Sequence, residues 1–276
     1  MTHNLENYLE VACGLTKEVG QIIRNKIWVD KQSVVTKEHK HDFVTETDQE
    51  VEKLLITGLS AQFPDHKFIG EETTSSGVKS EFTDDPTWII DPVDGTLNFV
   101  HGYPNVCVSI GLTINKELVV GIIYVPVPDL LFTAIKGQGA FLNGKQIHVS
   151  KAKDLSDSLL VLELSGGASD EQRRAAYVHY VTSFLPQVHG IRSSGSAAYN
   201  MATVALGAGD CYFEIGIHAW DMAAGAIIVR EAGGVVLDTL GGELDLMSRR
   251  VLCAATPELA KQVVPYIKQT SPARDD

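Results

Sequence analysis

The sequence predicts a mixed α/β protein in which layers of helices and strands pack on one another. Segments with apolar residues at helical spacing alternate with short apolar runs of strand length, and neither kind can bury its apolar side alone. Hydrophobic residues make up 44% of the 276 positions, enough for a large core. No linker, repeat or low-complexity tract divides the chain, so we expect residues 1–276 to form a single domain.

The N-terminal segment predicts two helices separated by a polar stretch. Apolar residues recur at helical spacing over Leu5–Ile23, which is typical of an amphipathic helix. The basic and polar stretch Lys31–His41 is expected to be an exposed loop. Thr47 and Glu50 form a capping-box pattern before a second helix, and Pro64 marks its end.

The middle of the chain predicts a series of strands. Trp88–Asp91 is an apolar run that Pro92 is expected to stop. Asn143-Gly144 is a strong hairpin signal. The remaining strands are expected at Tyr103–Asn115, Leu118–Val125, Leu131–Ile135 and Ala140–Val149.

Helices and strands alternate after Ser150. Pro265 is expected to kink the last helix or to end it early. The predicted helices lie near Asp170–Leu185, Ser196–Gly207, Met222–Ala232 and Pro257–Gln269, and the predicted strands near Val188–Arg192, Cys211–Ile215 and Val235–Asp238.

Charge and composition exclude several classes of partner. The formal net charge of −12 disfavours binding to nucleic acid or to an anionic membrane, and no apolar run is long enough to span a bilayer. The charged N-terminal segment does not resemble a signal peptide. Widely separated cysteines without metal-ligand spacing indicate reduced thiols in a cytoplasmic protein: Cys13, Cys107, Cys211 and Cys253.

The most informative motif is an acidic turn after the predicted strand at Trp88. Asp91 and Asp94 flank Pro92 and Val93, so their carboxylates and the Val93 carbonyl can face one point. Oxygen ligands of this kind suit Mg²⁺. If Thr96 opens a helix, the amides of Gly95 and Thr96 also form an anion site.

Two more acidic positions lie at junctions between apolar elements and turns. Glu71 follows the apolar Ile69-Gly70, and Asp221 precedes a predicted helix of small residues. Taken singly, each motif has an ordinary explanation: a solvated turn, surface charge or a helix cap. Together they predict a metal site, because clustered carboxylates repel strongly without a cation. We therefore expect a magnesium-dependent phosphatase for small phosphate monoesters, provided that the segments meet in space.

At these residues the chain resembles the inositol monophosphatase family. The resemblance runs from the first predicted helix to the last, with mild departures at Val93 and Leu97. It rests on Trp88–Thr96, on Trp220-Asp221-Met222-Ala223-Ala224-Gly225, on Gly70-Glu71-Glu72, on His41–Asp48 and on Leu244–Arg250.

The resemblance implies a five-layer α/β/α/β/α fold, a homodimer, and Mg²⁺-dependent hydrolysis of myo-inositol monophosphates. Two or three Mg²⁺ ions are implied per site, with Mn²⁺ as a substitute and Li⁺ as an inhibitor. The implied first metal is held by Glu71, Asp91 and the Val93 carbonyl, and the second by Asp91, Asp94 and Asp221. A third, weaker position would involve Glu71. Glu71 and Thr96 would position the attacking water, with Asp48 supporting Thr96.

The resemblance also implies the residues that contact the substrate. Asp94, Ala197 and Glu214 match positions that contact inositol hydroxyls, and Asp221 lies beside them. Gly195-Ser196 is expected at a helix N-terminus, and Gly95 and Thr96 face the phosphate. Lys37 is either a lysine that closes over the phosphate or an ordinary solvated one. His218 is interpreted as structural and not as a general acid.

Three alternatives remain open at this point. The same pocket suits broader sugar-phosphate hydrolysis. Bisphosphate nucleotidases and fructose bisphosphatases share the metal motifs but generally carry longer insertions, and Glu214 favours inositol. A non-catalytic scaffold on this fold is disfavoured, because every expected metal carboxylate and Thr96 are present.

Overall fold

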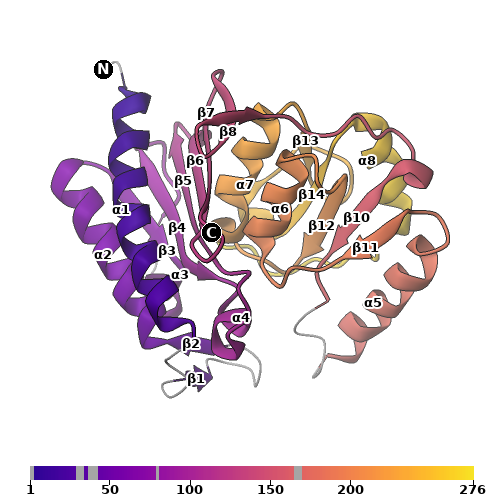
Figure 1. Ribbon diagram of the computed structural model, residues 1–276, viewed down its shortest axis with the longest axis horizontal. Helices are drawn as coiled ribbons and strands as arrows, with labels where there is room; N and C mark the ends of the chain where they lie inside the picture. Colours follow the sequence, from indigo (N-terminus) through magenta and orange to yellow (C-terminus); the bar gives the residue numbers. More distant parts are fainter. Residues whose placement is uncertain (1–2, 29–33, 37–42, 79–80, 165–169) are drawn as a thin grey trace.

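The computed structural model describes residues 3–28, 34–36, 43–78, 81–164 and 170–276. At 34–36 and 43–45 it describes the backbone alone. Helices and two sheets alternate in five layers, as expected (Figure 1). In order across the molecule, the layers are α1 (Leu5–Lys26) with α2 (Glu46–Gln62), a seven-stranded sheet, α6 (Ala197–Ala205) with α7 (Ala219–Glu231), a five-stranded sheet, and α5 (Glu171–Phe184) with α8 (Pro257–Val263).

The seven-stranded sheet is antiparallel except for the parallel pair β3 and β4, and its strands follow one another in chain order. Its hairpin turns at Asn143-Gly144, as predicted, and both turn residues have positive φ. The strands are β3 (Lys67–Gly70), β4 (Thr87–Asp94), β5 (Cys107–Ile114), β6 (Glu117–Val125), β7 (Leu130–Ile135), β8 (Gly139–Leu142) and β9 (Lys145–Ile147).

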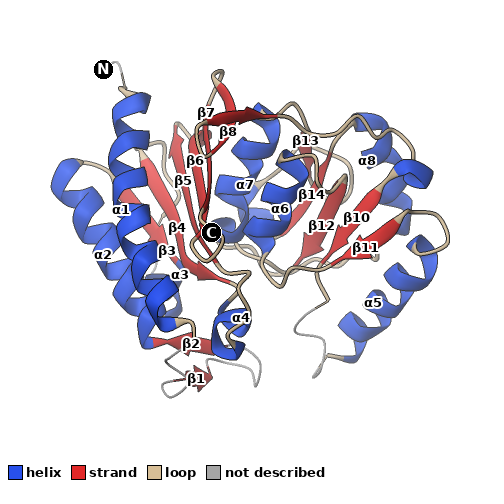
Figure 2. Ribbon diagram, viewed as in Figure 1, coloured by secondary structure: helices blue, strands red, loops and turns tan. Residues whose placement is uncertain are grey.

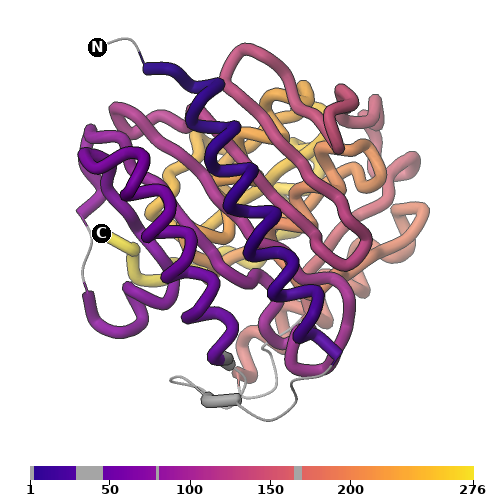
Figure 3. Tube along the Cα trace, turned by 60° about the vertical axis from the view of Figure 1, so that its left-hand side comes forward, coloured from indigo at the N-terminus to yellow at the C-terminus, as the bar shows by residue number. Residues whose placement is uncertain are grey.

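Both faces of this sheet are buried, which explains its nearly continuous apolar runs. Trp88 and Ile90 of β4 pack beneath α1 and α2, whereas Ile89 between them faces the α6–α7 layer. Figure 3 shows α1 and α2 side by side across the outer face of the sheet. Alternate side chains therefore serve two separate cores.

The five-stranded sheet combines predicted and unpredicted strands (Figure 2). Cys211–Ile215 forms β12 with the predicted bounds, whereas the short runs of β10 and β14 were not predicted. The strand order is β11 (Gly190–Arg192), β10 (Leu159–Leu162), β12, β14 (Arg250–Ala254) and β13 (Val235–Leu237).

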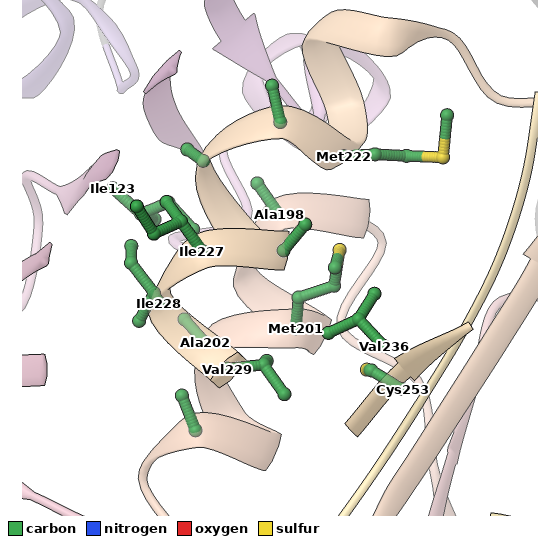
Figure 4. Close-up of a cluster of buried hydrophobic side chains, with 14 of the residues drawn as sticks. Ile123, Ala198, Met201, Ala202, Met222, Ile227, Ile228, Val229, Val236 and Cys253 are labelled. Carbon is green, nitrogen blue, oxygen red and sulfur yellow. The ribbon is translucent and has the colours of Figure 1, made fainter. Parts of the chain in front are cut away.

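Small residues let α7 fill the space between the two sheets. A Cβ atom on Gly111 of β5 would lie 2.6 Å from the Cβ of Ala223, so the strand and helix approach more closely than larger residues allow. Figure 4 shows Ile227 of α7 beside Ile123, and Met201 of α6 on the opposite side of α7. This packing fixes the position of the first turn of α7.

Four expectations about boundaries need correction. Helix α2 begins at Glu46, so Thr47 lies inside the helix and is not its N-cap. Strand β4 continues through Pro92, because a bulge accommodates the missing N–H there. Helix α7 begins at Ala219, which places Asp221 in its first turn and not before it. The expected strand from Tyr103 begins only at Cys107.

The segment Lys31–His41, expected to be a loop, lies largely outside the described residues, but it includes strand β1 (Val34–Thr36), which pairs with β2 (Phe43–Thr45). Near the other end of the chain, α8 ends at Val263 and continues as a 3-10 turn over Val264–Tyr266. Pro265 therefore accompanies an early end of the helix. None of the helices in the described part of the chain combines the length and apolarity needed to cross a bilayer.

Candidate metal centre

A β-bulge turns Asp91 and Asp94 toward the same point. Asp91 is paired with Ser109 of β5 and Asp94 with Cys107, so three steps along β4 match two along β5. In a regular strand, residues three apart would face opposite sides of the sheet. The extra residue in the bulge restores the same side for both carboxylates. The Asp91 Oδ1 atom also accepts a hydrogen bond of 3.0 Å from the Val93 amide, which stabilises the bulge.

The first turn of α7 brings Asp221 to these two carboxylates. One carboxylate oxygen from each of Asp91, Asp94 and Asp221 lies within 4.8 Å of the others. Asp91 and Asp94 are buried and Asp221 is partly buried. The Ser109 hydroxyl donates to the Trp220 carbonyl at 2.9 Å and ties the helix start to β5. The structure thus joins two motifs that lie 127 residues apart in sequence (221 − 94).

The electrostatics of this trio favour a cation. Burial raises the pKa of Asp91 well above its usual range, and nearby Glu71, Asp94 and Asp221 raise it further. Burial and the neighbouring acids, Asp94 foremost, likewise raise the pKa of Asp221. Within the described residues, no ion pair involves any of the three aspartates. Buried oxygens without a cationic partner are the ligands that a hard divalent cation requires.

Glu71 reaches Asp91 from the end of β3. It is the first residue of α3 (Glu71–Ser75), and its carboxylate lies close enough to Asp91 to raise the pKa of that residue. Buried Glu52 of α2 fixes the start of α3 by accepting hydrogen bonds from the amides of Glu72 at 2.7 Å and Thr73 at 2.8 Å. A Cβ on Gly70 would lie 2.6 Å from the Glu52 carboxylate, so only glycine leaves room for this contact.

Thr96 and Asp48 form a hydroxyl–carboxylate pair beside the trio. Helix α4 (Thr96–His101) begins at Thr96, as the sequence suggested, after Gly95 in a left-handed conformation at φ 92°. The Thr96 hydroxyl lies 3.1 Å from Asp48 Oδ1 and 3.0 Å from the Val93 carbonyl. Because a hydroxyl has one proton, it donates to one of these acceptors at a time and keeps its lone pairs for another donor.

Asp94 also caps the N-terminus of α6. Its carboxylate accepts from the Ser196 hydroxyl at 2.6 Å and from the amides of Ala198 at 2.6 Å and Ala197 at 3.2 Å. Burial raises the pKa of Asp94 to about 6, although these hydrogen bonds lower it. Ser196 caps α6 through the Tyr199 amide, as expected of a helix N-terminus.

Glu214 lines a cavity of about 530 Å³ between α5, β12 and residues 268–272. Burial raises its pKa to about 8, and neighbouring Glu163 raises it while the Tyr212 hydroxyl, which donates to Glu214, lowers it. Glu163 in turn accepts from the Gly195 amide at 2.9 Å. Gly195, Ser196 and Ala197 thus lie between Asp94 and the Glu163–Glu214 pair.

Sequence reasoning did not identify Glu52, Glu163 and Tyr212. Glu52 carried a usable signal, since a glutamate on the apolar side of a helix, next to Val51 and one turn from Leu55, needs a buried partner. Glu163 and Tyr212 lie on short strands whose facing sides the sequence does not reveal. Lys37 lies outside the described residues.

The chain matches the inositol monophosphatase family over residues 4–271. It is 46% identical to inositol monophosphatase 1 from Bos taurus, and to the protein of the same name from Homo sapiens, over 97% of this chain and 96% of each relative.

Solved structures agree with these sequence relatives. The extragenic suppressor protein suhB of Bartonella henselae superposes with a TM-score of 0.85 at 30% identity, over 95% of this chain and 99% of that chain. The inositol monophosphatase from Anabaena gives a TM-score of 0.82 at 32% identity, over 98% of each chain. Both sequence and fold thus agree over nearly the whole chain, and the protein belongs to the inositol monophosphatase family.

Proposed function

We propose that this protein hydrolyses myo-inositol monophosphates to inositol and inorganic phosphate with Mg²⁺. The observation that carries the proposal is the trio of Asp91, Asp94 and Asp221, which offer one carboxylate oxygen each within 4.8 Å of one another. Close relatives named inositol monophosphatase support the substrate class. The negative net charge of the chain makes a cationic centre necessary for attracting a phosphate ester.

The proposed ligands follow the geometry of the centre. Asp91, Asp94 and Asp221 would share one Mg²⁺, and Glu71 with Asp91 and the Val93 carbonyl would hold another, with Glu71 at a weaker third position. Bound Mg²⁺ supplies positive charge for the phosphoryl oxygens and lowers the pKa of a bound water. Mn²⁺ as a substitute and Li⁺ as an inhibitor belong to the same proposal.

Thr96 is proposed to orient the attacking water. When its hydroxyl donates to Asp48 Oδ1 at 3.1 Å, an oxygen lone pair is left to accept a hydrogen bond from water. Glu71, which reaches Asp91, would accept a proton from that water. The first amides of α4, with Gly95 and Thr96, lie at the end of the helix that favours the phosphate anion.

Substrate hydroxyls are proposed to meet Asp94, Glu214 and the start of α6. Carboxylates are good acceptors for polyol hydroxyls, and the small residues Gly195, Ser196 and Ala197 let the ring approach the backbone. Asp221 completes this side of the pocket. His218 takes no part as an acid, since its two ring nitrogens contact Asp275 at 2.8 Å and Arg249 at 3.1 Å.

We further propose a homodimer of single-domain chains in the cytoplasm. The four described cysteines are free thiols, which suits a reducing compartment.

Phosphate release tests the proposal. Release from inositol 1-phosphate with Mg²⁺ should exceed release from fructose 1,6-bisphosphate and adenosine 3′,5′-bisphosphate, and excess EDTA should abolish it. Activity that persists in EDTA would refute the metal mechanism. Equal turnover of the three esters would refute the substrate assignment, and no turnover of any ester would favour a scaffold.

A further inference from the structure

A carboxylate from the last residues of the described chain holds the helix that carries Asp221. Residues 273–276, here called the clasp segment, lie against the start of α7, and Figure 1 marks the end of the chain there. Asp275 Oδ2 accepts a hydrogen bond of 3.0 Å from the Ala219 amide, the first N–H group of α7. This amide has no partner within the helix, and a negative charge at this end is favourable.

The same carboxylate also fixes His218, the N-cap of α7. Asp275 Oδ1 lies 2.8 Å from His218 Nδ1, while Arg249 Nη2 lies 3.1 Å from Nε2. A carboxylate accepts and a guanidinium donates, so these partners select the tautomer with its proton on Nδ1. The held ring stacks on Trp220 with its centroid 4.5 Å away and an interplanar angle of 7°.

His218 is in direct contact with the proposed metal ligand. Its backbone amide donates to Asp221 Oδ2 at 2.6 Å, so the orientation of this carboxylate depends on where His218 is held. The clasp segment is itself anchored to the rest of the chain by two contacts: the Asp275 amide donates to the Met247 carbonyl at 3.1 Å, and Arg274 forms an ion pair with Asp245. Asp275 is mostly buried, with 12% of its side chain exposed.

We propose that Asp275 is a positioning residue for the metal centre: through Ala219 and His218 it holds the first turn of α7, and thereby Asp221, in the orientation that binds the cation. The inference rests on the proposed function, because it assigns Asp221 to a metal. Removal of a group that orients a metal ligand in this way commonly weakens metal affinity by about 10–100-fold.

The test compares Asp275→Ala with Asp276→Ala. Both changes remove one aspartate from the clasp segment, but among the described contacts Asp276 pairs with Arg274 at the surface and does not touch α7. Mn²⁺ binding to metal-free protein is measured at 25 °C from the loss of the electron paramagnetic resonance signal of free Mn²⁺. We expect the Kd of Asp275→Ala to rise at least about tenfold and that of Asp276→Ala to stay within twofold of wild type.

A purely structural role would lower the unfolding temperature in EDTA without changing the Kd of the folded protein. Asp275→Asn, which keeps the size and one acceptor, should give an intermediate Kd, and it replaces the alanine variant if that variant does not fold. If the Kd of Asp275→Ala were within twofold of the Kd of Asp276→Ala, the positioning role of Asp275 would be overturned while the proposed function stayed intact. If wild-type protein bound no Mn²⁺, the proposed function would fail first and the clasp with it.

Discussion

Replacing Asp91 by asparagine should stabilise the metal-free protein against unfolding. The same substitution should abolish phosphate release in the presence of Mg²⁺. The substitution removes one negative charge from three carboxylates whose oxygens lie within 4.8 Å of one another. Each ionised pair at that distance repels by about 3.5 kcal/mol at an effective dielectric near 20. Asparagine keeps the Oδ1 atom that accepts from the Val93 amide, so the bulge in β4 should survive.

The raised pKa values decide how much of this repulsion the protein carries. Because the pKa values of Asp91 and Asp221 are raised, the folded metal-free protein retains protons that the unfolded chain releases above the ordinary value of 3.8. Wild-type stability should therefore fall as pH rises from about 4. The advantage of Asp91→Asn should be near zero at pH 4 and should grow as the pH rises to 8, because the carboxylates that repel Asp91 ionise over this range.

Magnesium should act in the opposite direction and favour the wild-type protein. At a concentration about 100-fold above its Kd, a cation that binds only the folded state adds about 2.7 kcal/mol. Wild-type protein gains this stabilisation, whereas Asp91→Asn loses a ligand and gains little. Thermal unfolding with EDTA and with Mg²⁺, at pH 4 and pH 8, measures all four conditions. The exposed Asp84, replaced by asparagine, provides a control with the same charge change outside the cluster.

Two results would refute this reasoning. One is a loss of stability of Asp91→Asn in EDTA at pH 8, which would mean that the carboxylate has a favourable partner. The other is equal stabilisation of variant and wild type by Mg²⁺, which would place the cation elsewhere.

Three further substitutions probe the groups around the trio. Glu52→Gln should lower the unfolding temperature by about 5 °C, because the side-chain amide of glutamine cannot accept all the hydrogen bonds that Glu72 and Thr73 donate. The kcat should fall as well. An unchanged unfolding temperature would contradict the role of Glu52 in fixing the start of α3. Thr96→Val should lower kcat at least about a hundredfold while the Kd for Mn²⁺ stays within threefold, and a kcat near wild type would exclude Thr96 from orienting water. Glu214→Gln should raise the unfolding temperature relative to wild type at pH 8 but not at pH 4, since the folded pKa of about 8 lies above the ordinary 4.5 and wild-type stability falls between these values. A difference that does not vary with pH would argue against that shift. The preference of the Glu214→Gln variant between inositol and sugar phosphates should also weaken.

The sequence could predict the elements that carry a strong local signal. The hairpin at Asn143-Gly144 and the strand Cys211–Ile215 were placed correctly, because turn chemistry and a compact apolar run are local properties. The convergence of Asp91, Asp94 and Asp221 could be inferred only from charge and from resemblance. The bulge that produces it depends on pairing with β5, and Pro92 alone indicated the end of a strand.

Supporting groups were the hardest to predict, because their partners are distant in sequence. Glu52 meets the amides of residues 72 and 73, and Asp275 meets the start of α7 more than 50 positions away. Neither residue belongs to a short motif, and an acidic residue near the end of a chain has no local feature that distinguishes it from surface charge. Tertiary contacts decide their role.

The acidic residues of the centre fall into two groups according to their partners. Glu52, Asp94 and Asp275 each accept backbone amides at the start of a helix, α3, α6 and α7 respectively, where the helix dipole favours negative charge. Asp91 and Asp221 also accept one backbone amide each, from Val93 and His218, but they face the other acids and pair with no cation among the described residues. Asp94 belongs to both groups, since one carboxylate caps α6 and also borders the proposed metal. Binding of a cation there would therefore act on the start of α6, where the substrate is expected, so Asp94 would link the proposed metal to the proposed substrate pocket.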